Sequence, residues 1–346
     1  MSTIPSPRKR LRENPPALIV EGADDTAVAV VSIPDDASES EDAQDALDDA
    51  LRKVSEAVGG IEVSGDAGPL LIRHLLPDGT DPATVGAFFD VDQTLVRGAT
   101  SFWAAREMFR RSFFGVRDLA YAARKTIRYV VLGEQEGQIS TFGDRAASLV
   151  AGKTLEELEL IGQSIFESYF IPKVYKGTFS ILKAHIEAGH TVYLVSATPW
   201  LIAEELARRL GAAGGIGTKT KIHDGLLVGE LDGRVMHGAE KVVAVEEIAA
   251  EHDLDLANSF AYSDSANDIP MLSLVGHPVA VNPDRALRAY ARAKGWTIYR
   301  AYERSDLIKR GATNAEQVIG ATGIAYLILR GGSKGWGHLW KKLTGK

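Results

Sequence analysis

Five short apolar runs, separated by stretches with helical periodicity, constrain the fold of this 346-residue chain more than any other feature. Each run predicts a strand: VGAFFD (85–90), TVYLVSA (191–197), SFAYSD (259–264), HPVAVN (277–282) and WTIYR (296–300). Helical periodicity flanks the second run and precedes the third, at residues 181–188, 201–210 and 241–252. Strands that are apolar on both faces and alternate with helices are typical of parallel sheets. The pattern predicts an α/β domain, a Rossmann-like parallel sheet with helices on both faces.

Two insertions interrupt this pattern. Residues 101–170 are amphipathic and helical nearly throughout, with IRYVVL (127–132) as a weak strand candidate. An insertion at the carboxyl end of the first strand would lie over the crevice where open α/β sheets bind ligands, so we expect a helical cap over residues 99–171. The second insertion, residues 220–232, alternates apolar and polar residues around the turn pair Asp224 and Gly225, which predicts a small β-hairpin.

Residues 1–80 have the composition of a disordered acidic tail. The first 60 residues hold 6 Lys and Arg against 13 Asp and Glu, and the rest of the chain holds 33 of each. With few aromatic residues, this segment has too little apolar surface to order itself. Residues 41–58 can form a transient helix. We expect a solvated linker, with an interaction arm as the alternative.

Composition also excludes several classes of protein. The body carries balanced charge, which gives no support for binding nucleic acid. The absence of cysteine excludes disulfides, thiolate metal sites and cysteine nucleophiles, and fits a reducing cytoplasm. No apolar run approaches the roughly 20 residues that cross a bilayer, and the basic start is not followed by a signal-peptide core. We therefore expect a soluble cytoplasmic protein.

Two carboxylates, Asp90 and Asp92, follow the first strand in the sequence DVDQT. Because the chain turns at the end of a strand, both can face the same crevice. Together they can bind a divalent cation, or serve as a nucleophile and an acid–base pair. The alternative is structural, with Asp92 or Thr94 capping a helix.

Two single residues follow along the chain. Ser196 ends the second strand, where its hydroxyl can hold a phosphate oxygen or cap the next helix. Lys241 begins a helix, where the helix dipole mildly opposes a cation. Taken alone, this lysine indicates only a solvated surface residue.

A second pair of carboxylates, Asp264 and Asp268, follows the third strand in YSDSAND. Small residues between them form a tight acidic turn that can take a hard cation, or an Asx-turn leading into a helix at 269–274. All four polar clusters thus follow a strand or begin a helix of one predicted sheet. Chance would rarely place all four, so the order predicts a shared site.

These motifs, FFDVDQTL, YLVSATP, the lysine of GAEKVVAVEEI and YSDSANDIPML, resemble those of the haloacid dehalogenase superfamily. The long insertion resembles the helical cap that follows the first strand in one subfamily of this superfamily, the phosphoserine phosphatase-like enzymes. The resemblance covers about residues 85–300. It implies a phosphatase domain at 81–300, with core 81–98 and 172–300 and cap 99–171, followed by a helical or basic tail at 301–346.

The resemblance also implies a Mg²⁺-dependent phosphomonoester hydrolase. Asp90 would attack phosphorus and form an aspartyl-phosphate, while Asp92 would protonate the leaving group and later activate water. Mg²⁺ would cancel the charge repulsion. The resemblance further implies that Asp90, Asp264 and the backbone carbonyl of Asp92 bind the metal, and that Lys241 neutralises charge on the phosphoryl oxygens. Ser196 and Asn267 would contact the phosphoryl group. Asp268 would orient Lys241 or a water molecule at the metal, and Thr94 would shape the loop.

The sequence departs from the subfamily pattern where the substrate binds. Phosphoserine phosphatases usually have a Glu nine residues after the nucleophile, and this chain has Ala99. Arg145 stands where the cap often supplies an Arg for a substrate carboxylate, although an ordinary surface Arg is the alternative. We expect a small phosphomonoester as substrate. The alternatives are a lipid-like phosphomonoester such as lysophosphatidate, a phosphotransferase, and a non-catalytic scaffold.

The C-terminal segment combines GIAYLIL with a basic stretch that contains Trp336 and Trp340. Trp and Lys on a short amphipathic element suit a membrane interface. The more common outcome is a final helix that packs on the domain with a solvated basic end. Peripheral membrane contact through this tail is therefore the alternative to a purely cytoplasmic location.

Overall fold

The computed structural model describes residues 17–21, 28–32, 62–64, 72, 75–114 and 147–301, the first three ranges as backbone only. The chain forms two compact units. The first consists of Met1–Ala87, Tyr175–Thr191 and Ala249–Glu303, and the second of Phe88–Val174, Val192–Ile248 and Arg304–Lys346. Both units combine parallel strands with helices, which gives an α/β, Rossmann-like fold as predicted.

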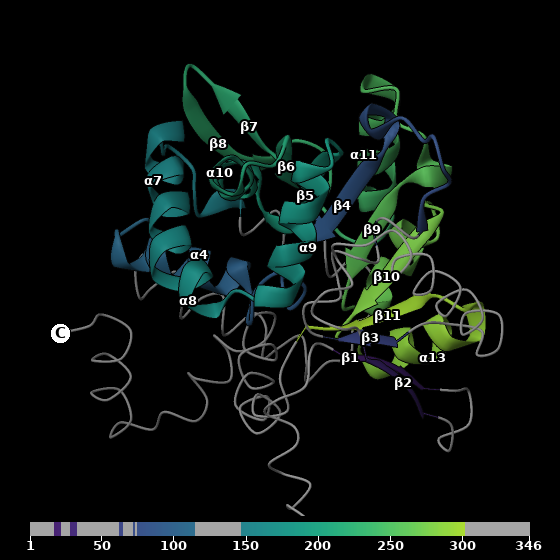
Figure 1. Ribbon diagram of the computed structural model, residues 1–346. Helices are drawn as coiled ribbons and strands as arrows, with labels where there is room; N and C mark the ends of the chain where they lie inside the picture. The colour runs from purple at the N-terminus through teal and green to yellow at the C-terminus, as the bar shows by residue number, and fades with distance from the viewer. Residues whose placement is uncertain are drawn as a thin grey trace, which may run out of the picture. The chain divides into compact units, whose positions relative to one another are not determined.

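The first unit is built on parallel strands that occur in the order β3 (Glu62–Ser64), β11 (Thr297–Arg300), β10 (His277–Val281) and β9 (Phe260–Ser263). Figure 1 shows β9, β10 and β11 side by side. Their side chains are buried on both faces, with Phe260, Tyr262 and Tyr299 fully buried. This burial explains why β9 to β11 are apolar almost without interruption.

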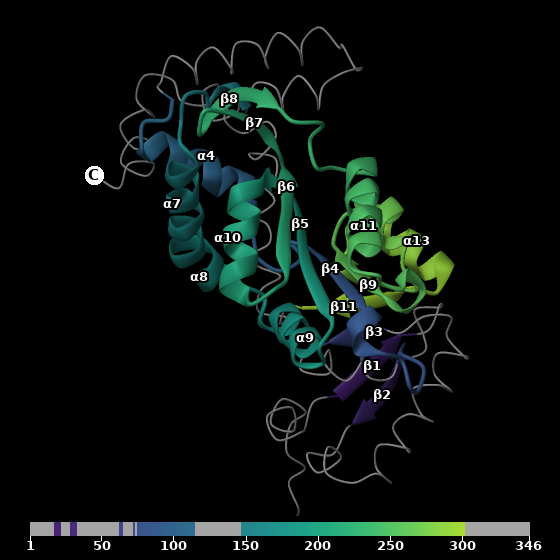
Figure 2. The same cartoon turned by 90° about the horizontal axis from the view of Figure 1, so that it is seen from above.

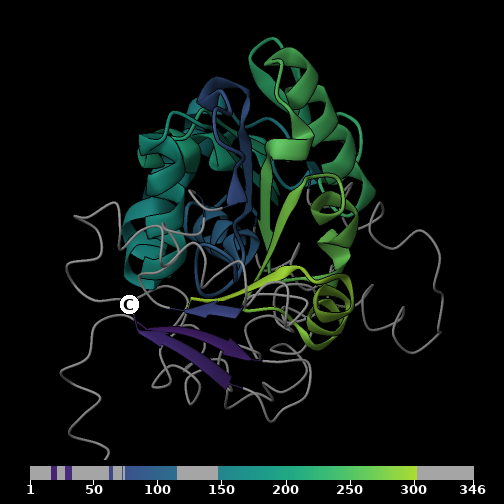
Figure 3. The same cartoon turned by 45° about the vertical axis from the view of Figure 1, so that its right-hand side comes forward.

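Helices complete the first unit: α9 (Lys176–Glu187), α12 (Ile269–Leu272) and α13 (Arg285–Lys294), with 3₁₀ turns η2 (Pro82–Thr84), η4 (Leu256–Asn258) and η5 (Ala266–Asp268). Figure 3 shows α13 beside the ends of β10 and β11. Asp284 caps α13 through a 2.8 Å hydrogen bond from the Leu287 N–H, and Gly295 ends it with φ of 66°. A side-chain cap at the start and a left-handed glycine at the end fix both helix boundaries.

Two strands that the sequence did not predict, β1 (Ala17–Glu21) and β2 (Val28–Ser32), form an antiparallel pair within the segment expected to be disordered. Strand β3 also lies in that segment. ALIV and VAVV are short apolar runs that contain β-branched residues, which have high strand propensity, and the disorder expected for residues 1–80 stays a prediction. The helix predicted at 41–58 lies outside the described residues.

The second unit contains β4 (Gly86–Asp90) from Phe88 onward, and the parallel pair β5 (Thr191–Pro199) and β6 (Gly214–Thr218). Helix α10 (Trp200–Leu210) connects β5 to β6, and Figure 2 shows it alongside them. A Cβ atom at Gly215 would lie 2.2 Å from the carbonyl oxygen of Ala203. Only glycine allows α10 to approach β6 this closely. Because β6 is rich in glycine, it lacks the apolar run by which the other strands were predicted.

The described residues of the predicted cap, 99–114 and 147–171, contain α4 (Thr100–Arg110), α7 (Leu155–Ile165), the π-helical turn η3 (Phe166–Phe170) and α8 (Ile171–Lys173). Thr154 and Glu157 form a capping box that starts α7. Trp103 of α4 stacks on Tyr169 with ring centroids 5.6 Å apart. The strand candidate at 127–132 lies outside the described residues.

The predicted hairpin is confirmed as β7 (Thr220–His223) and β8 (Leu226–Leu231). Its turn residues Asp224 and Gly225 have φ of 50° and 78°, as a two-residue hairpin turn requires. Backbone hydrogen bonds join Leu227 of β8 to Gly152 and Lys153, both at 2.8 Å. The hairpin is therefore attached to the residues that lead into α7. Helix α11 (Ala239–Glu251) follows in the sequence.

Candidate active site

The centre of the candidate site is an ion pair between Asp90 and Lys241. Asp90 is the last residue of β4 and 7% exposed, and Lys241 lies in the first turn of α11 and is 3% exposed. The Lys241 Nζ donates a 2.7 Å hydrogen bond to Asp90 Oδ1. The fold thus brings together two residues 151 positions apart that the sequence motifs assigned to one site. The Asp90 carboxylate thus gives Lys241 a negatively charged partner, which the start of a helix does not itself provide.

The turn after β4 also holds Asp90. The Thr94 Oγ1 donates to Asp90 Oδ2 at 3.0 Å, so both carboxylate oxygens accept hydrogen bonds. The turn is closed by backbone bonds from Leu95 N to Val91 O (3.0 Å) and from Gln93 N to Val96 O (2.8 Å). Gln93 has φ of 62°, which lets the chain reverse within these residues. Thr94 therefore fixes the carboxylate as well as the loop.

Asp92 caps helix α4, as the structural alternative expected, through a partner that the sequence did not predict. Its Oδ1 accepts hydrogen bonds from both the backbone N–H and the side-chain hydroxyl of Thr100, at 2.8 and 2.5 Å. Thr100 is the first residue of α4 and is fully buried. In the sequence, Thr100 is only a hydroxyl residue at the start of a predicted helix. That position does not indicate which carboxylate the residue contacts.

Ser196 is buried in β5, where its Oγ accepts a 3.2 Å hydrogen bond from the Thr198 N–H. The Thr198 Oγ1 is buried without a hydrogen-bond partner among the described residues. Thr218 of β6 donates its hydroxyl to the Ala197 carbonyl at 2.8 Å and so supports the end of β5. This strand end therefore offers two hydroxyl groups to a polar ligand.

The acidic turn that follows β9 lies in the first unit. Asp268 is 3% exposed and its Oδ2 accepts a 2.7 Å hydrogen bond from the Ser263 hydroxyl. Asp264 is half-buried and Asn267 is exposed. The Asn267 N–H donates to Ser265 Oγ at 3.2 Å, which starts the turn η5. The turn is thus ordered by its own serines, as an Asx or Ser turn would be.

Asp284 supports this turn and was missed by the sequence reasoning. Its N–H donates to the Asp264 carbonyl at 2.8 Å, and its Oδ2 accepts from the Ala266 N–H at 2.9 Å. The same side chain caps α13 through Oδ1. The sequence does contain an indication of this role. Asn-Pro-Asp before an amphipathic stretch is a pattern that starts helices.

The chemistry of the donors fits Mg²⁺. Carboxylate and carbonyl oxygens are the ligands that this cation prefers, and the predicted set consists of Asp90, Asp264 and the Asp92 carbonyl. Within the described part of the chain, no cluster of three or more Asp, Glu or His side chains could hold a metal ion. The predicted set contains two carboxylates and one backbone oxygen, so it does not require such a cluster.

Two predictions fall on residues that the structure does not describe. Arg145, the expected contact for a substrate carboxylate, lies outside the described residues, and so does the C-terminal segment from residue 302 onward. Among the helices that are described, none has the length and apolar character needed to span a bilayer.

A second buried polar cluster lies in the first unit. His185 Nδ1 lies 2.7 Å from His190 Nδ1, and His185 Nε2 lies 2.7 Å from the Tyr262 hydroxyl. Burial lowers the pKa of His185 well below its ordinary value and, with a smaller contribution from Tyr299, raises the pKa of Tyr262 well above its own. Both shifts favour the uncharged forms, so this cluster is a chain of neutral hydrogen bonds.

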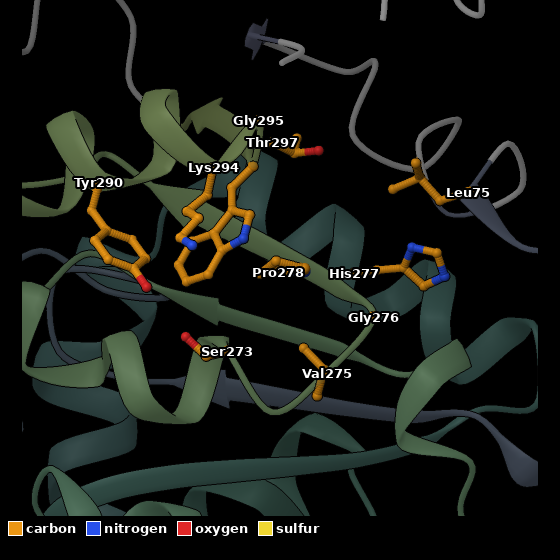
Figure 4. A pocket seen from close by; sticks show the side chains of 11 residues that line it. Leu75, Ser273, Val275, Gly276, His277, Pro278, Tyr290, Lys294, Gly295 and Thr297 are labelled. Carbon is orange, nitrogen blue, oxygen red and sulfur yellow. The ribbon is translucent and has the colours of Figure 1, made fainter. Parts of the chain in front are cut away.

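A cavity of about 520 Å³ also lies in the first unit (Figure 4). Tyr290 and Trp296 meet edge to face beside it, with ring centroids 5.1 Å apart. The cavity is bounded by His277 and Thr297, the first residues of β10 and β11, whereas Asp264 follows the last residue of β9. Because these strands are parallel, the cavity lies at the opposite strand ends from the acidic turn and is not the predicted phosphate site.

Residues 87–273, more than half of the chain, match the family model described as haloacid dehalogenase-like hydrolase. The chain therefore belongs to this family of hydrolases. It is 39% identical over 216 residues to a protein of Mycobacterium tuberculosis named phosphoserine phosphatase, an alignment that covers 62% of this chain and 70% of the relative. It is 31% identical over 227 residues to the inhibition of morphological differentiation protein of Streptomyces azureus, covering 65% and 79%.

A solved structure supports the same fold. The crystal structure of a Bordetella pertussis protein of unknown function is 28% identical in sequence and superposes with a TM-score of 0.55. The match covers 63% of this chain and 100% of that protein. Family and fold thus agree with the motifs from which the site was predicted.

Proposed function

We propose that this chain is a Mg²⁺-dependent phosphomonoesterase that works through an aspartyl-phosphate on Asp90. The observation that carries the proposal is the buried pair of Asp90 and Lys241, 2.7 Å apart, at the end of a strand that matches the family model. A desolvated ion pair costs stability to form, so a fold gains little from it unless the charges are used. The relatives named as phosphatases support the same activity.

In the first step, an oxygen of Asp90 attacks phosphorus while the bond from phosphorus to the ester oxygen breaks. Asp92 gives its proton to the departing alkoxide. The Lys241 ammonium lies against the nucleophile and reduces its repulsion with the phosphoryl oxygens. Thr94 holds the second oxygen of Asp90, so that rotation of the carboxylate is restricted before the attack.

In the second step, Asp92 takes a proton from water, whose oxygen attacks phosphorus while the bond from phosphorus to the Asp90 oxygen breaks. Inorganic phosphate leaves and Asp90 is restored. We propose that Asp90, Asp264 and the Asp92 carbonyl hold Mg²⁺, which supplies positive charge to the phosphoryl oxygens. Ser196 and Asn267 are the proposed phosphoryl contacts. Asp268, held by the Ser263 hydroxyl, is proposed to support Lys241 or a water molecule at the metal.

The proposed substrate is a small phosphomonoester, with phosphoserine as the first candidate because of the relative with that name. Ala99 offers no carboxylate for a substrate ammonium, so a different small ester is the main alternative. The cysteine-free sequence supports a reducing compartment, and we propose a cytoplasmic enzyme.

The test is phosphate release from a panel of L-phosphoserine, lysophosphatidate, sugar phosphates and p-nitrophenyl phosphate, with Mg²⁺ and with excess chelator. Asp90→Asn is the blank, because it is nearly isosteric with wild type and cannot form the acyl phosphate. The proposal expects Mg²⁺-dependent release that the blank lacks. Equal release by wild type and Asp90→Asn would overturn it.

A further inference from the structure

Asp92 is held by the first residue of the cap. The Thr100 N–H and hydroxyl both donate to one oxygen of the carboxylate, Oδ1, at 2.8 and 2.5 Å. The N-cap residue of α4 is Ala99, which has no side chain that can make a capping hydrogen bond. The Asp92 carboxylate, eight residues before Thr100, therefore caps the helix in its place.

The packing around α4 fixes these two donors. Gly98 has φ of 109°, and a Cβ atom there would lie 2.6 Å from the ring of Trp103. Trp103 is 2% exposed, and the Lys173 ammonium lies 5.0 Å from its ring centroid. The Arg97 N–H donates to the Lys173 carbonyl at 2.9 Å. The chain that enters the cap is thus held on both sides of Thr100, which leaves its N–H and hydroxyl little freedom to move.

We propose that Thr100 is the positioning residue for Asp92 in the reaction, an inference that rests on the proposed function. Two donors on Oδ1 fix the plane of the carboxylate. That plane decides whether Oδ2 can deliver a proton to the leaving oxygen, since proton transfer requires a hydrogen-bonded geometry. Thr100 contacts neither substrate nor phosphorus in this scheme and acts only through Asp92.

This role predicts a dependence on the leaving group. An alkoxide is a poor leaving group and needs a proton as the ester bond breaks, whereas p-nitrophenolate leaves without one. In the first step, which kcat/KM reports, a residue that orients the acid therefore matters for alkyl esters and hardly for the aryl ester. The second step, in which Asp92 acts on water, is common to both esters. A residue that only stabilises the fold or binds phosphate affects both esters alike.

The experiment compares Thr100→Val and Thr100→Ser with wild type on the best alkyl ester of the panel and on p-nitrophenyl phosphate. Valine has nearly the same shape as threonine and lacks the hydroxyl, while the backbone N–H remains. We expect the kcat/KM of Thr100→Val to fall about tenfold or more on the alkyl ester, a part of the 10²- to 10⁴-fold value of general acid catalysis. On the aryl ester we expect kcat/KM to fall by less than about twofold. Thr100→Ser should recover most of the lost rate.

Thr178→Val is the matched control. Thr178 is also fully buried, and its hydroxyl has no hydrogen-bond partner among the described residues. The same chemical change there should leave both rates at the wild-type value. Thermal unfolding of each variant verifies that the compared proteins are folded.

A double-mutant comparison tests whether Thr100 acts through Asp92. In an Asp92→Asn background the proton is no longer available, so Thr100→Val should slow alkyl ester hydrolysis no further. The inference is overturned if Thr100→Val lowers kcat/KM equally for both esters, lowers it for neither, or lowers that of the Asp92→Asn enzyme as much as that of wild type. If wild type and Asp90→Asn release phosphate equally, the proposed function fails and this inference fails with it.

Discussion

The two units of the molecule bury polar groups in opposite ways. In the second unit, Asp90 and Lys241 form a charged pair in which both side chains are less than one tenth exposed. In the first unit, His185, His190 and Tyr262 form a hydrogen-bonded chain that burial keeps neutral. Both clusters satisfy their hydrogen bonds, and only the first retains charge.

The difference separates groups kept for chemistry from groups kept for structure. A neutral cluster that satisfies its hydrogen bonds is tolerated in a core at small cost. A charged pair pays a desolvation penalty that its attraction rarely exceeds. We therefore expect changes in the charged cluster to reduce activity as well as stability, and changes in the neutral cluster to act only on stability.

The largest expected effect is that of Asp90→Asn on phosphate release. Without the nucleophilic oxygen, kcat should fall by at least about a thousandfold, as losses of other enzyme nucleophiles do. Asp224→Asn makes the same chemical change on a side chain that is 87% exposed at the hairpin turn, and should leave the rate unchanged. Comparable losses of kcat in Asp90→Asn and Asp224→Asn would show that the loss is not specific to the charged cluster.

The second-largest expected effect is that of Lys241→Met, which should lower the free energy of unfolding by about 3 kcal/mol in addition to its loss of activity. The variant leaves the buried Asp90 carboxylate without its ammonium partner. Urea unfolding measures the loss, and the exposed Lys221, in an ion pair with Glu230, provides the control as Lys221→Met. The double variant Asp90→Asn with Lys241→Met should be more stable than Lys241→Met alone, and a simple sum of losses would contradict the pairing.

The neutral cluster predicts a pH dependence of stability. The folded pKa of His185 lies below its ordinary value of 6.5, so the unfolded chain takes up the proton first as the pH falls. The stabilisation is complete above pH 6.5 and is lost progressively as the pH falls below that value. Urea unfolding of wild type and His185→Gln between pH 7.5 and 5.5 measures this. His190 and His277 also have lowered pKa values, so the variant should lose part of the slope, and an unchanged slope would refute the assignment.

The smallest expected effect is that of Tyr262→Phe, at about 1 kcal/mol of unfolding free energy. The change removes the hydroxyl that lies 2.7 Å from His185 Nε2 and leaves the fully buried ring in place. Phosphate release should stay within about twofold of wild type, because no charge is altered. A tenfold loss of kcat here would show that the neutral cluster takes part in the chemistry.

The pattern of apolar runs was sufficient to predict β4, β5, β9, β10 and β11, because strands buried on both faces leave little room for polar residues. The pattern failed for β6, whose sequence GGIGT is dictated by the close approach of α10 and not by side-chain burial. It also failed for β1 and β2, where a polar, acidic composition outweighed two short β-branched runs.

In the candidate site, the motifs located the pair of Asp90 and Lys241, because strand ends and helix starts are visible in sequence. Thr100 and Asp284 were not predicted. Each acts through a contact that depends on how the chain folds back, Thr100 onto Asp92 and Asp284 onto the turn after β9. Such contacts have no fixed spacing from the groups they support, so they became apparent only from the three-dimensional arrangement.

The attachment of the hairpin to the cap has a consequence for engineering. Leu227 of β8 exchanges backbone hydrogen bonds with Gly152 and Lys153, while a Cβ atom at Gly229 would lie 2.7 Å from that of Ala151. Residues 172–219 separate cap and hairpin in the sequence, and the two segments still share one edge. A chimera that takes its cap from a relative should therefore import two segments, residues 99–171 and Thr220–Leu231, since a cap with a larger side chain in place of Ala151 would no longer fit against Gly229.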